Sequence, residues 1–296
     1  MRLGGGPESS NFEDRTGQSG GFGGGGFGGG GLGCLLPLIA SRFGIGGVVV
    51  LVIGYFLLSS LGGLGGGGVL PSSPSQRSAP SGQSTLSPQT KEFLLHVLGY
   101  TEQTWSQIFA KEGKQYEPTK LVAYTGGTRT ACGLGQAPMG PFYCPNDNSI
   151  YLDPAFFNEL SRRFGAPGDF AQAYVIAHEV GHHVQDLEGT LNQAHNMQAR
   201  ASETEGNAIQ VKVELQADCY AGVWAANARD AQGSIMEQGD LEEGMRAAEA
   251  IGDDTLQKQS QGRVVPDSFT HGTSAQRMNA LRTGFQSGDP TACESL

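Results

Sequence analysis

The chain of 296 residues carries 19 basic and 29 acidic side chains, which gives it a formal net charge of −10 at pH 7. This acidic balance argues against binding to nucleic acid and to anionic lipid. More than half of the 47 glycines precede residue 69, so only the remaining part is able to bury an apolar core, and we expect one globular domain.

The first 42 residues are expected to be disordered. They include the run GGFGGGGFGGGGLG, which is too poor in apolar side chains to offset the entropy lost on ordering. Phe22 and Phe27 could support self-association, but a flexible tether is the preferred interpretation.

Residues 43–64 have the length and apolar character of a transmembrane helix. A cleaved signal peptide is the alternative, but it would need a short basic N-terminal region, and more than forty residues precede the apolar run. The flanking charge of Arg42 favours a cytoplasmic N-terminus. We therefore expect an uncleaved anchor, a Pro/Ser/Gly-rich linker over residues 65–87, and an extracytoplasmic domain over residues 88–296.

The cysteines of this domain are even in number, which suits two disulfide bonds in an oxidising compartment. They are Cys132, Cys144, Cys219 and Cys293, and four cysteines allow three pairings. We favour Cys132 with Cys144, because RTACGLGQAPMGPFYC reads as two extended segments joined by a Gly/Pro-rich loop. Cys219 with Cys293 then follows by elimination. The spacings are not the CxxC type that is typical of zinc-binding thiolates.

The domain is predicted to be α+β, mainly helical with a small β-sheet. Two helices are expected over KEFLLHVLG and, after a cap at Thr101, over TEQTWSQIFAK. Extended segments follow over LVAYTGG and up to SIYLD, and another helix begins after Asp153 and Pro154. Later helices contain HEVGH and ELQAD, with a polar connection over residues 188–207 between them, and a further helix begins near Asp240.

The stretch AHEVGHHVQ holds three of the six histidines around one glutamate. A helix turns about 100° per residue, so His178 and His182 share one stripe, whereas His183 points away from them. Two imidazoles one turn apart can bind one Zn²⁺, and Glu179 is placed to take a proton from an attacking water. The alternative is a surface helix on which Glu179 only pairs with a neighbouring histidine.

Two histidines leave a catalytic zinc site one ligand short. The metzincin pattern would place a third histidine at position 188, but that residue is Glu188. The helix VKVELQADCYAGVWAA offers Glu214 and, one turn later, Asp218 on the same face. We expect Glu214 to be the third ligand and Asp218 to accept the other ring N–H of a ligating histidine. The alternative is a solvated acidic stripe, but the neighbouring side chains look buried.

HEVGH followed by ELQAD resembles the HExxH and ExxAD signature of gluzincin metallopeptidases. Residues 85–290 as a whole resemble the bacterial neutral zinc metallopeptidase family, including YCPNDNSIYLD, AAEAIGDDTLQ and FTHGTSAQR. The resemblance implies a zincin-like fold, one Zn²⁺ per chain, a peptide or protein substrate, and a single-pass protein of the bacterial inner membrane.

The resemblance also implies two features of substrate binding. Related gluzincins carry a histidine and an arginine in a similar C-terminal segment, so His271 is our candidate for oxyanion stabilisation, with Tyr220 as the second. A sheet edge beside the active-site helix aligns extended substrate in such folds, and SIYLD or YTGGTRTA is the expected edge.

The function predicted from these motifs is a membrane-anchored zinc endopeptidase with Glu179 as general base. The alternative is a non-catalytic module at the cell envelope in which zinc only stabilises the fold. Glu179 favours the enzyme, because a structural zinc site needs no general base.

Overall fold

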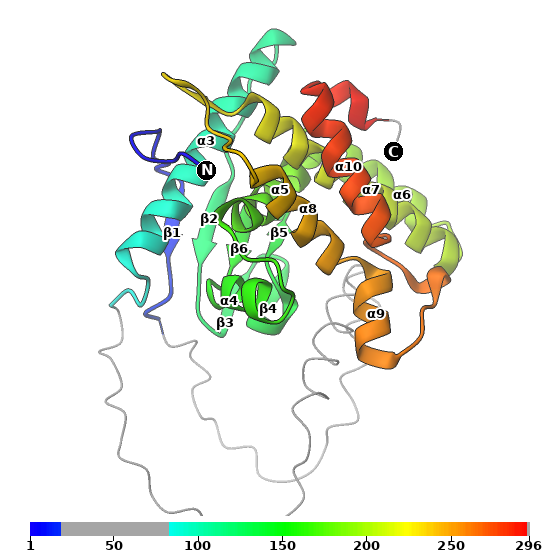
Figure 1. The fold of residues 1–296 in the computed structure, drawn as a ribbon. Helices are drawn as coiled ribbons and strands as arrows, with labels where there is room; N and C mark the ends of the chain where they lie inside the picture. Colours follow the sequence, from blue (N-terminus) through cyan, green and yellow to red (C-terminus); the bar gives the residue numbers. More distant parts are fainter. Residues whose placement is uncertain (19–82, 295–296) are drawn as a thin grey trace, which may run out of the picture.

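A sheet and the helices packed against it make up the part of the chain that the computed structural model describes, residues 1–18 and 83–294 (Figure 1). The helices are α3 (Pro88–Lys111), α4 (Ala155–Arg162), α5 (Asp169–Leu187), α6 (Thr190–Gln198), α7 (Glu203–Asn227), α8 (Asp240–Ala250), α9 (Asp253–Gln261) and α10 (Ser274–Ser287). The strands are β1 (Phe12–Asp14), β2 (Lys120–Ala123), β3 (Gly127–Thr130), β4 (Gly133–Gln136), β5 (Phe142–Cys144), β6 (Ser149–Leu152), β7 (Arg229–Asp230) and β8 (Gly233–Ser234). Short 3-10 helices are η1 (Ala137–Met139), η2 (Pro266–Ser268) and η3 (Pro290–Cys293).

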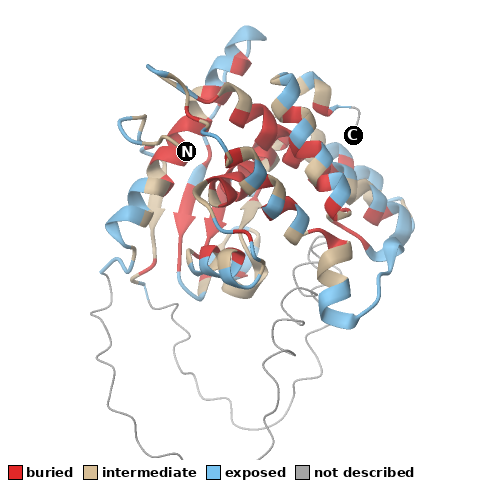
Figure 2. Cartoon of the chain, in the orientation of Figure 1, coloured by how far each residue is buried: buried red, intermediate tan, exposed pale blue. Residues whose placement is uncertain are grey.

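The main sheet has the strand order β1-β2-β6-β5. The first three of these strands run parallel, and β5 runs antiparallel to β6. All four residues of β6 and the last three of β2 are buried, as expected for central strands covered on both faces (Figure 2). The hairpins β3–β4 and β7–β8 are separate from this sheet. The prediction of a mainly helical domain with a small sheet is confirmed for the described residues.

Glycines allow α7 to lie very close to its helical neighbours α5 and α10. A Cβ at Gly284 of α10 would lie 1.9 Å from the carbonyl oxygen of Cys219. A Cβ at Gly181, the glycine of HEVGH, would lie 2.9 Å from the carbonyl oxygen of Ala217. Side chains at these positions would separate the helices, so the two glycines set the spacing on both sides of α7.

Two details of the predicted helices are wrong. A cap was expected at Thr101, but α3 is continuous there, and the Thr101 hydroxyl donates to the Leu98 carbonyl at 2.7 Å. This bond satisfies the hydroxyl inside the helix, so no break is needed. The predicted polar connection over residues 188–207 contains α6, which begins after Gly189 in the left-handed conformation (φ 82°).

The N-terminal residues 1–18 are not disordered, which corrects the predicted fold class. β1 pairs with β2, with Phe12 opposite Leu121. Gly99 of α3 leaves room for this segment, because a Cβ there would lie 2.4 Å from the carbonyl oxygen of Pro7. Composition alone suggested disorder because the pairing partner lies more than a hundred positions later.

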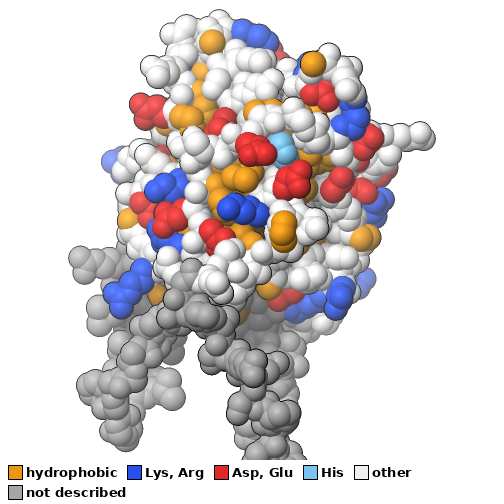
Figure 3. Space-filling view, turned by 90° about the vertical axis from the view of Figure 1, so that its left-hand side faces the viewer, with side chains coloured by type: hydrophobic (Ala, Val, Ile, Leu, Met, Phe, Trp, Pro, Cys, Tyr) orange, Lys and Arg blue, Asp and Glu red, His pale blue; other side chains and the backbone are white. Residues whose placement is uncertain are grey.

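On the face at the left of Figure 1, acidic and basic side chains are interspersed with apolar ones (Figure 3).

The prediction of one transmembrane helix, and with it a single-pass location in the inner membrane, is also corrected. Within residues 1–18 and 83–294, no helix combines the length and the apolar character that a bilayer crossing requires. The predicted span, residues 43–64, lies outside these ranges.

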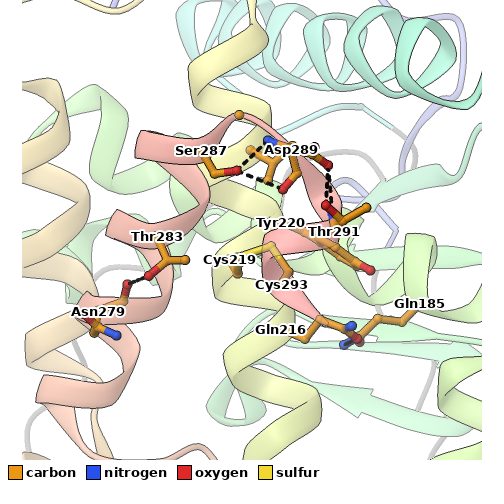
Figure 4. The surroundings of a disulfide bond; sticks show 12 residues. Gln185, Gln216, Cys219, Tyr220, Asn279, Thr283, Ser287, Asp289, Thr291 and Cys293 are labelled. Atoms are coloured by element: carbon orange, nitrogen blue, oxygen red, sulfur yellow. Dashed lines mark hydrogen bonds between the residues drawn. A yellow bond between two sulfur atoms is a disulfide. The ribbon is translucent and has the colours of Figure 1, made fainter. Parts of the chain in front are cut away.

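Both disulfide pairings predicted from the sequence are present. Cys132–Cys144 ties the β3–β4 hairpin to β5. Cys219–Cys293 joins α7 to η3 (Figure 4), and both of its cysteines are buried. The second bond therefore fixes the C-terminal segment beside the part of α7 that carries Asp218.

Candidate metal centre

The side chains of His178, His182 and Glu214 meet between α5 and α7. One potential ligand atom from each lies within 4.8 Å of the other two. The Glu214 Oε2 atom is 3.2 Å from His178 Nε2 and 3.5 Å from His182 Nε2. Two imidazole nitrogens and one carboxylate oxygen that converge on one point suit Zn²⁺, with a fourth position left for water or substrate. The predicted set of three is thus brought together by two helices that Gly181 holds in close contact.

Asp218 holds His178 in the orientation that this site requires. Its Oδ1 lies 2.7 Å from His178 Nδ1, as expected from the sequence. Arg277 of α10 donates to both carboxylate oxygens of Asp218, from Nε at 2.8 Å and from a terminal nitrogen at 2.9 Å. The hydroxyl of Tyr174, one turn before His178, donates to the same carboxylate at 2.5 Å. The two hydrogen bonds from Arg277 compensate the buried charge of Asp218.

The charges around the ligands shift their pKa values in opposite directions. Burial lowers the pKa of His178, but Asp218 and Glu214 outweigh it and raise the pKa to about 10. Burial raises the pKa of Glu214, but His182, His271 and His178 outweigh it and hold that pKa well below its usual range. In the protein without metal, these opposite shifts favour a protonated His178 opposite an ionised Glu214.

Glu179 is buried beside these ligands but is not one of the three converging groups. Burial raises the pKa of its carboxyl, and the neighbouring His178 and His182 only partly oppose that shift. A carboxylate that is made more basic in this way is suited to accepting a proton.

His271 lies in a loop that the carboxylate of Asp253 organises. The Oδ2 atom of Asp253 accepts the amide N–H groups of Thr270 and His271, both at 2.7 Å, and of Gly272 at 3.1 Å. His271 Nδ1 is 3.3 Å from Asp253 Oδ1. Burial lowers the pKa of His271, but Glu214 and Asp253 outweigh it and raise the pKa. The charge of Glu214 contributes to this shift, although His271 is not one of the three converging ligand residues.

The second oxyanion candidate, Tyr220, points elsewhere. Its hydroxyl donates to Glu188 at 2.8 Å, and its ring packs on Trp105. His183 also has a structural environment, with Nε2 at 2.6 Å from the Glu117 carbonyl and Nδ1 at 3.0 Å from the Tyr143 hydroxyl. Neither residue joins the three converging ligands.

Sequence reasoning missed three residues that support the site. Arg277 ends the segment FTHGTSAQR, but nothing in the sequence showed that it is buried against Asp218. Asp253 lies in AAEAIGDDTLQ, a segment whose sequence showed only a resemblance to the family. Gln185 accepts at Oε1 from His182 Nδ1 at 2.9 Å, and the sequence did not indicate this contact because a glutamine is usually exposed.

Comparisons with known proteins agree with this centre. The family model described as "Putative neutral zinc metallopeptidase" matches residues 1–296. "Uncharacterized protein YpfJ" of Escherichia coli (strain K12) is 48% identical over 302 residues, which cover 100% of this chain and 99% of that protein. "Uncharacterized protein Mb2605" of Mycobacterium bovis is 40% identical over 190 residues, which cover 61% of this chain and 63% of that protein. No solved structure matches. With two histidines and a glutamate at one point and a family match along its whole length, the chain belongs to the neutral zinc metallopeptidase family.

Proposed function

We propose that this chain is a zinc-dependent endopeptidase with His178, His182 and Glu214 as metal ligands and Glu179 as general base. The family itself points to a zinc-dependent peptidase. The observation that carries the finer assignment is the convergence of three ligand atoms within 4.8 Å beside a buried glutamate that is not among them.

The residues divide the chemistry between them. Bound Zn²⁺ would supply Lewis-acid polarisation of the scissile carbonyl and of the attacking water. Glu179 takes the proton of that water and returns it to the leaving amine, and its raised pKa suits both steps. His271, whose pKa is raised by the charge of Glu214 and by its contact with Asp253, is the candidate that would donate a hydrogen bond to the developing oxyanion.

An extended substrate would pair with β5, the outer strand of the main sheet next to α5. The sequence analysis expected SIYLD or YTGGTRTA to form this sheet edge, and both predictions are wrong. SIYLD forms β6, which is paired on both sides, and YTGGTRTA contributes to the separate β3–β4 hairpin. The Tyr143 hydroxyl on β5 donates to Asp186 of α5 at 2.9 Å. This contact supports a fixed position of the β5 edge relative to the helix that carries Glu179.

The test is Glu179→Gln in the full chain, with zinc supplied and a peptide mixture as substrate. The amide is nearly isosteric and Glu179 is not a ligand, so zinc content and unfolding free energy should stay the same while cleavage falls by roughly 10²- to 10⁴-fold. Glu203→Gln, an exposed position on α7, is the matched control and should cleave normally.

Chelator treatment should abolish cleavage by the wild type and by the control. Equal cleavage by wild type and Glu179→Gln would contradict the proposal. If all three proteins bind zinc and none cleaves any peptide, the non-catalytic zinc module becomes the better assignment.

A further inference from the structure

Gln185 is a fully buried amide that contacts both helices of the candidate metal centre. It lies on α5 one turn after His182, and its Oε1 is 2.9 Å from His182 Nδ1. Its Nε2 donates to the Val213 carbonyl at 2.8 Å and to Gln216 Oε1 at 2.8 Å. Both N–H bonds of the amide and its oxygen are therefore used.

These contacts determine which way the amide points. A backbone carbonyl can only accept, so the nitrogen of the Gln185 amide must face Val213, and its oxygen must face His182. An amide oxygen carries no hydrogen, so His182 Nδ1 must be the donor of the 2.9 Å bond. In a neutral imidazole the other nitrogen, Nε2, is then unprotonated, and this is the atom that lies 3.5 Å from Glu214 Oε2.

We propose that Gln185 is a positioning residue that selects the Nδ1–H tautomer of His182 and so holds its Nε2 lone pair at the metal position. The inference rests on the ligand set of the proposed function. The two histidines are thus oriented by different chemistry. His178 is held by the carboxylate of Asp218, whose charge is compensated by Arg277, whereas His182 is held by a neutral amide. Replacing a side chain that hydrogen-bonds to a metal ligand typically lowers metal affinity by about 10- to 100-fold.

A purely structural role is the competing explanation, because the same amide ties α5 to α7 through Val213. Two substitutions separate the roles. Gln185→Glu keeps an acceptor for His182 Nδ1–H but removes the amide donors to Val213 and Gln216. Gln185→Met has a similar volume and removes the acceptor as well as both donors. Tautomer selection requires only the acceptor, whereas the structural role requires the donors.

The experiment measures zinc affinity by competition with a chromophoric chelator in full-length protein, together with urea unfolding of the metal-free forms. We expect Gln185→Met to lose about 10- to 100-fold in zinc affinity and Gln185→Glu to stay within a few fold of wild type, although both unfold at lower urea. Asn207→Leu is the matched control, because this buried amide on α7 donates to the Asp267 carbonyl. It should lose stability and keep zinc affinity.

A second readout needs no metal. The ¹⁵N shifts of the His182 ring in the metal-free protein should show a protonated Nδ1 in wild type and in Gln185→Glu, and a loss of that preference in Gln185→Met. Equal losses of zinc affinity in the two variants, no loss in Gln185→Met, or an unprotonated Nδ1 in wild type would each overturn the inference. These readouts do not involve peptide cleavage, so a failure of the Glu179→Gln test leaves them interpretable.

Discussion

The helices around the candidate metal centre and the central strands of the sheet are stabilised by different interactions. Between α5, α7 and α10, the buried groups include charged or titratable side chains, namely His178, Glu179, Glu214, Asp218 and Arg277. On β2 and β6, the side chains buried at the centre are mainly apolar, such as Leu121, Val122, Ile150 and Leu152. Apolar burial is insensitive to pH, whereas buried charges stabilise a fold only while each keeps its partner. The stability of the helical region should therefore depend on pH and metal, and that of the sheet should not.

The largest expected effect comes from removing the partner of Asp218. Arg277→Met leaves the Asp218 carboxylate buried without its bidentate donor, and we expect a loss of about 3–5 kcal/mol in unfolding free energy, measured by urea denaturation. Arg282→Met, at an exposed position on the same helix, is the control and should change stability by less than about 0.5 kcal/mol. A small effect of Arg277→Met would mean that solvent reaches Asp218.

The metal-free protein should show the pH dependence of the helical region. The pKa of His178 is raised to about 10 in the folded protein, above its value in the unfolded chain. The stabilisation that protonated His178 contributes is therefore complete below the pKa of the unfolded chain, and it is lost as the pH rises through the pKa of the folded protein. Between pH 7 and 9 the loss of the His178 contribution alone should lower the unfolding free energy by about 1.4 kcal/mol per pH unit. Urea titrations with and without zinc measure this, and the zinc-loaded protein should lack this slope because the metal replaces the proton. A flat profile without zinc would show that His178 is neutral there.

The smallest effect tests the region around the sheet. Gly99→Ala raises helix propensity by up to about 1 kcal/mol, but its Cβ would lie 2.4 Å from the Pro7 carbonyl oxygen. We expect the clash to dominate, with a net loss of about 1–2 kcal/mol that does not change with pH or zinc. Ser106→Ala, on the exposed face of α3, should not destabilise. A gain of stability in Gly99→Ala would show that residues 1–18 do not pack on α3 in solution.

The sequence predicted those parts of the site that lie one helical turn apart. His178 with His182 and Glu214 with Asp218 follow from the 3.6-residue period, and the disulfide pairings followed from an even count and one local loop. The role of each residue in catalysis stays a prediction. Arg277 reaches Asp218 from another helix, so no local pattern could place it.

The N-terminal segment shows the same limit for the fold. β1 has three residues and no apolar alternation, and it is a strand only because β2 offers a partner far along the chain. The helix expected over KEFLLHVLG ended at Gly99, but Gly99 lies inside α3, at the point where this helix meets Pro7. Both predictions were wrong because the structure of these segments depends on contacts with residues far away in the sequence.

The position of β1 at the outside of the sheet also affects how separate molecules meet. An unpaired strand edge can pair with the edge of another chain, and charged side chains make such an edge a poor template. β1 carries Glu13 and Asp14, with Arg15 next in sequence and bonded to Glu13 at 2.6 Å. A chain without residues 1–18 would instead expose the backbone edge of β2, next to the apolar Leu121 and Val122. Such a shortened protein would be prone to edge-to-edge association even where its metal centre remained intact.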